Sequence, residues 1–383
     1  MNKQLVVIGH MAENLCCGGG LVDGLVESGF DCYKISVDPD YPWRVAGGHK
    51  TQEEWFAAGM KHPQYDFHVF SSQKTWGGYC KSQDHAKAVF NGWEPVYVRE
   101  ILEHEDVYPD AILLTHSQDF IWDFRGIPSD IPVYYYFTGA VCWPRWPHNV
   151  RVRGFFYGYQ DAPGTFRDMY PMQYHDLTFK SFLPNAYSAK TWYPPVPDNI
   201  SNRTIDLGFM GGMDFDRGTW FSQQLYKERQ QYIHHLQHEH DLDLRPSQSQ
   251  ATCRDFLQHV FLGANISCFG VNMRQFEVPA CGALLLQYEN MDSAATGLVN
   301  RENCLLFKDI TQLDEQVKWA LSHRDEADAI RREGVKYAQN NSFYHRGKEL
   351  AEVLNKDLSL FNEMATETGT QPPNNQNLVN ESG

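Results

Sequence analysis

The sequence predicts an α/β protein of two doubly wound halves, each a parallel sheet covered by helices, facing each other across a cleft. In both halves, short apolar runs with strand character alternate with segments of helical spacing. A proline-rich polar segment, residues 188–204, separates the two alternations. The 383 residues, of which 42% are hydrophobic, suffice for two such cores. Ligands of such sheets bind beyond the carboxyl ends of the strands, so the cleft is the expected site.

The first half begins as strand, glycine loop, helix and strand. The apolar run at 5–10 is the first strand, the segment ENLCCGGG a loop, and 21–29 a helix that ends at Gly29 as its C-cap. A second strand at 32–38 is followed by an insertion rich in Trp and Gly. The other predicted elements of this half are a helix at 86–93 and extended segments at 65–72, 94–100, 109–118, 131–139 and 177–187.

The second half repeats the alternation after the linker. Residues 205–212 form a strand that ends in two glycines, and 221–240 form a polar helix. Further strands are predicted at 264–270, 283–288 and 302–309, followed by amphipathic helices at 313–323, 326–341 and 345–361. The polar segment at 363–383, rich in Pro, Asn and Gly, is predicted to be a disordered tail.

Charge and cysteine usage restrict the partners and the compartment. A formal net charge of -15 argues against a broad basic face for nucleic acid. No stretch approaches the roughly 20 apolar residues of a membrane helix, and the N-terminus reads as a strand rather than a signal peptide. The nine cysteines form no CxxC pair, which predicts reduced thiols in a cytoplasmic protein.

Four blocks of the second half carry a family resemblance. In chain order they are FLPNAYSAKTWYP, DLGFMGGMDFDR, NMRQFEVPACGALLL and NNSFYHRGKEL, spread between Phe182 and Leu354. Together they resemble a group-1 glycosyltransferase of the GT-B fold, and most closely its CgeB-like (spore-maturation) branch. The last block keeps Arg346 but has Asn341 where a histidine is common in that branch. In the first half, only segments 109–118 and 131–139 resemble the family.

The resemblance implies the division of the chain and its activity. Residues 1–185 would form an acceptor-side Rossmann-like domain, and 186–362 the domain that binds the nucleotide-sugar donor. The enzyme would transfer a sugar from a nucleotide diphosphate sugar to an acceptor hydroxyl on a glycan, a protein, a small molecule or a modified DNA base. The resemblance also implies no metal and no cofactor apart from the donor substrate, because a helix dipole and arginine side chains replace the metal.

The segment from Asn272 to Tyr288, NMRQFEVPACGALLLQY, is the main candidate for the donor site. A helix that starts near Asn272 would direct unpaired N–H groups toward a diphosphate. Arg274 would add a fixed positive charge as the phosphate leaving group departs. Glu277, one turn later on the same face, could accept hydrogen bonds from ribose hydroxyls. Gly282 would let the helix turn tightly into the apolar strand; the alternative is an ordinary surface Arg/Glu pair with a glycine cap.

Two glycine clusters extend the candidate site. Gly211 and Gly212 allow close approach of the backbone, and Arg217 could reach the phosphates, although a plain strand-to-helix turn would use the same residues. At the exit of the first strand, the cluster Gly18, Gly19 and Gly20 could cradle a phosphate. Its spacing matches neither GxGxxG nor the P-loop.

His116 and Asp119 are the candidates for a catalytic base, because they follow a strand whose carboxyl end faces the cleft. The alternative assigns Asp119 to a helix N-cap and His116 to a structural role. Phe269 stands eight residues before Glu277, where many retaining group-1 enzymes carry a second glutamate. Its presence leaves retaining or inverting stereochemistry open.

Two other functions remain open at the level of sequence. A phage-type enzyme that glucosylates hydroxymethylated bases in DNA would share the fold, and the segment RVRGFF is locally basic and aromatic. A catalytically inactive protein that binds nucleotide sugars or glycans would explain Phe269. The aromatic segment CWPRWPH, with Arg145 and Arg151 nearby, could stack on a sugar or a base, or could be core and lid packing. The donor sugar, the nucleotide base, the acceptor and the oligomeric state are not determined by the sequence.

A histidine cluster, HHLQHEHD, lies at the end of the helix predicted at 221–240. His234 and His238 are one helical turn apart and could bind Zn²⁺. No third ligand is evident and the pattern is not HExxH, so the cluster is predicted to be a solvated helical face and no metal ligand is assigned.

Overall fold

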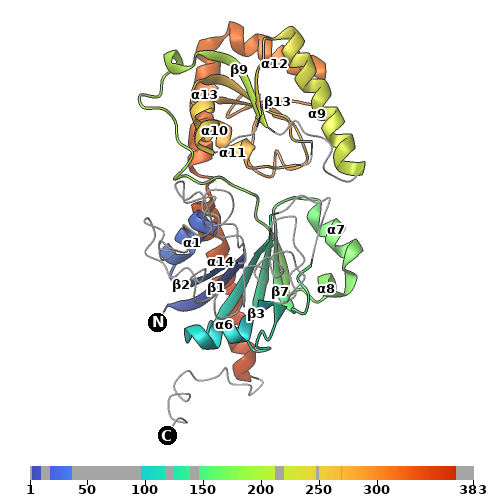
Figure 1. The fold of residues 1–383 in the computed structure, drawn as a ribbon, viewed down its shortest axis with the longest axis vertical. Helices are drawn as coiled ribbons and strands as arrows, with labels where there is room; N and C mark the ends of the chain where they lie inside the picture. The colour runs from blue at the N-terminus through green and yellow to red at the C-terminus, as the bar shows by residue number, and fades with distance from the viewer. Residues whose placement is uncertain are drawn as a thin grey trace, which may run out of the picture.

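The chain folds into two lobes, each built around its own parallel sheet and stacked along the long axis of the molecule (Figure 1). The computed structural model describes residues 2–9, 18–36, 96–116, 124–138, 146–211, 220–246, 250–268 and 270–367. Two parallel sheets with helices around them confirm the predicted fold class. The predicted insertion elements at 65–72 and 86–93 lie outside the described residues.

The first lobe contains a six-stranded sheet in the order β2-β1-β4-β6-β7-β8, and every neighbouring pair is parallel. Its strands are β1 (Lys3–Gly9), β2 (Phe30–Ser36), β4 (Ala111–His116), β6 (Val133–Phe137), β7 (Val152–Tyr157) and β8 (Phe179–Phe182). Its helices are α1 (Gly18–Glu27), α6 (Val98–Glu105), α7 (Ala162–Met169) and α8 (Pro171–His175), and β3 (Val96–Tyr97) pairs with β5 (Phe124–Arg125) at one side.

The second lobe contains a five-stranded parallel sheet in the order β10-β9-β11-β12-β13. Its strands are β9 (Ile205–Gly211), β10 (Asp243–Pro246), β11 (Val260–Asn265), β12 (Leu284–Tyr288) and β13 (Leu305–Phe307). Its helices are α9 (Trp220–Glu239), α10 (Gln250–Leu257), α11 (Arg274–Ala280), α12 (Ile310–Ser322) and α13 (Arg324–Gln339), and the linker carries the 3₁₀ turn η1 (Ile200–Asn202).

The central strands β6 and β11 are buried along their whole length because both faces of each sheet are covered. All five residues of β6 and all six of β11 are buried. A parallel strand that is covered on both sides reads as a continuous apolar run rather than an alternating one. This explains why VYYYF and ALLLQY could be identified as strands in the sequence.

Several elements differ from the sequence-based predictions. Helix α1 starts at Gly18, so the three glycines predicted as loop form its first turn. Residues 98–105, predicted as extended, form α6, because Val98 and Leu102 are buried one turn apart while Arg99 faces solvent. The strand predicted at 264–270 lies earlier, as β11. Elements β7, α7, α8, β10 and α10 were not predicted as such.

The last helix, α14 (Phe343–Glu367), leaves the second lobe and packs against α1 of the first lobe. It includes residues 363–367 of the predicted tail, and residues 368–383 lie outside the described part. Asp357 anchors α14 to the first sheet, since it accepts hydrogen bonds from Tyr134 Oη (2.8 Å) and from Arg153 Nε (2.6 Å) and Nη2 (3.0 Å). The division into domains 1–185 and 186–362 stays a prediction, and α14 contacts the lobe that precedes the linker.

Helices α1 and α14 cross with their backbones in contact through glycines. A Cβ atom at Gly24 would lie 2.1 Å from the carbonyl oxygen of Tyr344 and 2.9 Å from Cα of Gly347. A Cβ atom at Gly20 would lie 3.1 Å from Cβ of Phe343. Gly20 therefore allows α1 and α14 to pack closely against each other.

Substitution Gly24→Ala is expected to lower the free energy of unfolding by about 1–3 kcal/mol, because backbone atoms must move to admit the methyl group. That loss exceeds the gain of up to about 1 kcal/mol in helix propensity. Gly164→Ala in α7 is the matched control, since a Cβ there meets no atom within 4 Å. Urea unfolding of both variants measures the difference; equal stabilities would contradict the close crossing of α1 and α14.

Candidate active site between the lobes

The loops that follow the carboxyl ends of β7, β11 and β12 meet at one buried carboxylate. Asp292, after β12, accepts a hydrogen bond from the backbone N–H of Gln160, after β7, at 2.9 Å. Its other oxygen accepts from the backbone N–H of Val271, after β11, also at 2.9 Å. Asp292 is completely buried. The carboxyl edges of the two sheets therefore face each other, as the fold class requires for a shared ligand site.

Burial is the main cause of the shifted pKa values of the carboxyl groups at this contact. It raises the pKa of Asp292 although the N–H groups of Val271 and Gln160 act in the opposite direction. Asp161, at the start of α7, also has a raised pKa, first through burial and then through the charge of Asp292. Two carboxyl groups from different lobes thus lie close enough to influence each other.

Gly270 adopts a φ of +109° directly beside this contact. A Cβ atom at that position would lie 2.2 Å from Asp292 Oδ2 and 3.1 Å from Cδ1 of Tyr159. The glycine is required both by its backbone conformation and by the close approach of the two lobes. It stands two residues before Asn272, so the lobe contact is continuous with the predicted donor segment.

The predicted helix of the donor segment is α11, which begins at Arg274. The Asn272 side-chain oxygen accepts a hydrogen bond from the backbone N–H of Gln275 at 3.2 Å. The same side chain exchanges hydrogen bonds with Asn265, whose Nδ2 also donates to Gln287 Oε1 at 2.7 Å. Asn272 is therefore held by an amide network at the carboxyl ends of β11 and β12.

Arg274 and Glu277 lie together on the side of α11 that faces the linker. Arg274 Nη1 is 3.1 Å from Glu277 Oε2, and the guanidinium lies 5.5 Å from the ring centroid of Trp192 in the linker. Nη1 is buried and makes no hydrogen bond of good geometry to any part of the chain that the structure describes. Glu277 is 5% exposed, and burial raises its pKa while Arg274 lowers it. A buried ion pair with unused hydrogen-bonding capacity is unusual and points to a ligand.

The raised pKa of Glu277 predicts a pH-dependent stability. The folded protein holds this proton more tightly than the unfolded chain, so the free energy of unfolding falls as pH rises from the ordinary value of 4.5 through the folded pKa. Glu277→Gln has no charge to desolvate and is expected to flatten this part of the curve. Urea unfolding of both proteins across about pH 4 to 8 checks the slope. A steeper decline in the variant would show that Arg274 outweighs burial.

The C-terminal end of α11 is clamped to the linker, which fixes the position of the site. Gly282 has a φ of +82°, which confirms its predicted role in turning the chain from helix to strand. The carbonyl oxygen of Gly282 accepts from Arg331 Nη1 at 2.8 Å, and that of Cys281 accepts from Arg203 Nη1 at 3.1 Å. Both arginines also bind Asp198 in the linker.

Arg346, the residue that matches the family's closing helix, ties α14 to the segment between β8 and the linker. Its Nε donates to the carbonyl oxygen of Pro184 at 3.1 Å, and its Nη2 donates to Asn341 Oδ1 at 2.6 Å. Asn341, which replaces the histidine common in the family, therefore acts as an acceptor for Arg346. This pair supports the crossover between the lobes.

The other predicted site residues are distributed as follows. Gly211 ends β9, and a Cβ there would approach the Phe209 ring to 2.9 Å. His116 is the last residue of β4, at the carboxyl edge of the first sheet. The residues that lie outside the described part of the chain are Asp119, Gly212 and Arg217, together with Phe269. Their roles stay predictions, as do those of Gly18 and Gly19 in the first turn of α1.

Sequence reasoning missed three residues of this region: Gln160, Trp192 and Asp292. Asp292 carries a weak signal, because a carboxylate shortly after the buried strand ALLLQY lies at the functional edge of the sheet. Trp192 lies in the linker and in the first of the four family-like blocks, but neither signal assigns a role to its side chain. Gln160 contributes its backbone N–H, which no sequence pattern reveals.

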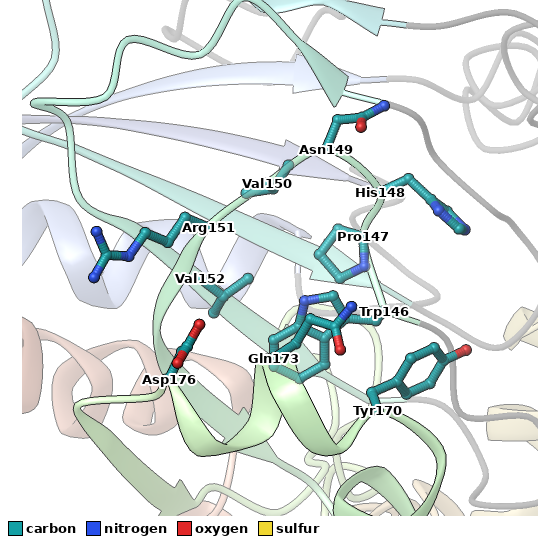
Figure 2. A pocket seen from close by; sticks show the side chains of 10 residues that line it. All are labelled: Trp146, Pro147, His148, Asn149, Val150, Arg151, Val152, Tyr170, Gln173 and Asp176. Atoms are coloured by element: carbon teal, nitrogen blue, oxygen red, sulfur yellow. The ribbon is translucent and has the colours of Figure 1, made fainter.

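The aromatic segment around Trp146 does not line the lobe contact. A cavity of about 500 Å³ lies where residues 146–152 lead into β7, against α7 and α8 (Figure 2). Its walls include Trp146, His148 and Arg151, with Tyr170 on the helical side. It stands at the amino end of β7, whereas the lobes meet beyond the carboxyl end. An aromatic platform for an acceptor in the cleft is therefore not formed by Trp146.

Comparison with known proteins agrees with this geometry. Residues 219–352 match a family model described as "Glycosyl transferase-like" (Glyco_trans_1_2). The solved structure of sucrose-phosphate synthase from Thermosynechococcus elongatus is similar, with 9% identity, a TM-score of 0.50 and coverage of 94% of this chain and 100% of that one. A glycosyltransferase from Rickettsia africae is similar at 10% identity and a TM-score of 0.50, over 95% and 98% of the two chains. No curated protein matches the sequence.

The fold is that of GT-B glycosyltransferases, with two Rossmann-like lobes around an interlobe site. The family match covers residues 219–352 only, and the glycosyltransferase family that it names agrees with this fold. In the part of the chain that is described, no helix has the length and apolar character needed to span a bilayer.

Proposed function

We propose that the enzyme takes a sugar from a nucleotide diphosphate sugar held by its second lobe and transfers it to an acceptor hydroxyl presented by the first lobe. The observation that carries the proposal is the buried pair of Arg274 and Glu277, which has an unused donor at Nη1 and lies close to the lobe contact. An anion with neighbouring hydroxyl groups fits this pair. A nucleoside diphosphate presents both, on its pyrophosphate and its ribose.

The roles of the two side chains follow from their chemistry. The guanidinium of Arg274 presents a fork of N–H groups that matches phosphate oxygens, and it stabilises the negative charge that develops on the leaving diphosphate. The carboxylate of Glu277 accepts hydrogen bonds from ribose hydroxyls, and donor binding would offset part of the cost of its burial. We assign the phosphate contact chiefly to Arg274, because α11 is only seven residues long.

On the acceptor side, His116 and Asp119 remain our candidates for the base that removes the hydroxyl proton. The position of His116 at the carboxyl end of β4 supports its assignment. Phe269 in place of a glutamate leaves either stereochemical outcome open, and the class of acceptor is equally open. A DNA acceptor and an inactive binding protein are not favoured by any feature of the described residues.

We further propose that the chain belongs to the CgeB-like branch, on the basis of its four sequence blocks, and that in the cytoplasm it transfers the sugar without a catalytic metal and without a cofactor apart from the donor substrate. In the described part of the chain, Cys268, Cys281 and Cys304 form no disulfide, which supports a reducing compartment.

Donor hydrolysis tests the proposal without knowledge of the acceptor. The full chain is incubated with a panel of UDP-, GDP-, ADP-, CDP- and TDP-sugars, and release of the nucleoside diphosphate is measured beside calorimetric binding of each free diphosphate. We expect binding of at least one diphosphate and slow hydrolysis of its sugar conjugate. Absence of both across the panel would refute the proposal, and binding without turnover in the presence of glycan acceptors would indicate a binding protein.

A further inference from the structure

Two imidazoles and a carboxylate converge on one point of the second lobe, away from the proposed active site. His235 Nε2 lies 2.7 Å from Asp314 Oδ1, and His240 Nε2 lies 2.5 Å from the same oxygen. One ligand atom from each of the three residues lies within 4.8 Å of the other two. Their elements are distant in sequence, since His235 lies near the end of α9, His240 directly follows that helix, and Asp314 belongs to α12.

The three groups are partly sheltered and well oriented. The side chains are 22%, 5% and 26% exposed for His235, His240 and Asp314, and the two rings meet edge to face at 6.1 Å between centroids. Lys318 Nζ lies 3.2 Å from the other carboxylate oxygen, Oδ2. The contact with Lys318 orients the carboxylate so that Oδ1 points toward both imidazoles, as outer partners do for ligands in metal sites.

As it stands, the arrangement requires a proton on Nε2 of both rings, because Asp314 Oδ1 can only accept. One divalent cation replaces both protons and lets all three atoms act as electron donors. Bonds of about 2.0–2.1 Å in a tetrahedral site separate ligand atoms by roughly 3.3 Å. Each Nε2 atom must therefore move away from Asp314 Oδ1 by less than about 1 Å to admit the ion.

We propose that His235, His240 and Asp314 form a binding site for a divalent transition-metal cation, with Zn²⁺ as the best match. Two nitrogen ligands and one oxygen ligand suit Zn²⁺, Co²⁺ and Ni²⁺ and do not suit Mg²⁺ or Ca²⁺, which prefer oxygen. Water completes the coordination shell.

The position of the site defines its role. It joins the C-terminal end of α9, just before β10, to the N-terminal half of α12, and it shares no residue with the contact between the lobes. The ion would join α9 to α12 and stabilise the lobe that binds the donor, with no part in the transfer reaction. Metal that binds only the folded state raises stability in proportion to the logarithm of its concentration.

This metal site could not be predicted from the spacing of the histidines in the sequence. His234 and His238, which share a helical face, are both exposed, whereas the ligands are their neighbours His235 and His240. Position 240 lies just beyond the last residue of α9, so the 3.6-residue spacing of a continuous helix does not apply to it. The third ligand comes from another helix, which a motif search along one segment could not find.

Metal titration of the full chain tests the proposal. After removal of metals with a chelator, Zn²⁺ binding is measured by calorimetry and by thermal unfolding, and Co²⁺ binding by its visible absorption. We expect one strong site, a rise in Tm with Zn²⁺ but not with Mg²⁺, and a Co²⁺ spectrum typical of tetrahedral coordination. Absence of a strong site in the wild-type chain would overturn the proposal directly.

The variants assign the ligands. His235→Ala and His240→Ala are each expected to weaken Zn²⁺ binding at least tenfold, while the double variant His234→Ala/His238→Ala binds as tightly as the wild type. Asp314→Asn keeps the size of the side chain and removes its charge, so it serves if an alanine variant does not fold. Equal losses in the control and in the ligand variants would show adventitious binding to surface histidines and refute the site.

Discussion

Replacement of Arg274 by glutamine is expected to lower the rate of sugar transfer by roughly 100- to 1,000-fold. Among the described residues of α11, Arg274 Nη1 is the only buried side-chain donor that lacks a well-formed hydrogen bond. Its charge is most useful in the transition state, when the diphosphate carries more negative charge than in the bound donor. The loss should therefore appear mainly in kcat, with a smaller rise in the KM for the donor.

Arg274→Lys tests the geometry of this contact separately from its charge. Lysine keeps the positive charge but loses the planar fork that binds two phosphate oxygens, so it should restore only part of the activity. Arg332→Gln is the matched control, because Arg332 lies on α13 with its side chain 69% exposed. Steady-state kinetics with the preferred donor, together with circular dichroism, separates loss of chemistry from loss of fold. Full activity of Arg274→Gln would remove this residue from the mechanism.

The core of the donor lobe was accessible from the sequence because its signals are local. The run ALLLQY, the preceding glycine and the Arg/Glu pair predicted a strand, a tight turn and a helical face within one short segment. The structure places Gly282 at a φ of +82° and pairs Arg274 with Glu277, as that pattern required. Each of these features depends on neighbours in the chain, which is why the sequence alone could indicate them.

The features that join the lobes were not accessible, because each depends on a distant partner. Asp292 gains its role from the N–H of Gln160, and Asp357 from Tyr134 and Arg153. Gly20 belongs to a cluster that predicted a phosphate loop, and the close approach of Gly20 and Gly24 to α14 explains their small size. A glycine cluster that predicts a phosphate loop from its local sequence can therefore owe its small residues to packing against a distant helix.

Asp292→Ala is the second substitution for which we expect a large effect. It should weaken the contact that holds the two lobes together. The substitution leaves the N–H groups of Gln160 and Val271 without their acceptor, and each unpaired buried group costs about 1–3 kcal/mol. Water can satisfy both groups only if the lobes separate at this point. We therefore expect a larger radius of gyration by small-angle X-ray scattering and a fall in kcat/KM of at least tenfold.

The substitution also acts on the donor segment, because Val271 stands between Gly270 and Asn272 and is held by the same carboxylate. A looser loop would shift Arg274 relative to the diphosphate, and small displacements of a positioned group lower rates strongly. Asp292→Asn retains one acceptor oxygen and can satisfy only one of the two N–H groups, so its effects should be intermediate. This gradation distinguishes lost hydrogen bonds from general destabilisation.

Asp206→Ala is the matched control, since Asp206 is 60% exposed and pairs with Arg324 at the surface of the same lobe. A surface ion pair of this kind contributes about 0–1 kcal/mol, so scattering and kinetics should match the wild type. If Asp292→Ala keeps the wild-type radius of gyration and the wild-type kcat/KM, the carboxylate does not couple the lobes. A change in stability with unchanged kinetics would assign Asp292 to folding of the second lobe alone, because the contact with Gln160 would then have no part in bringing donor and acceptor together.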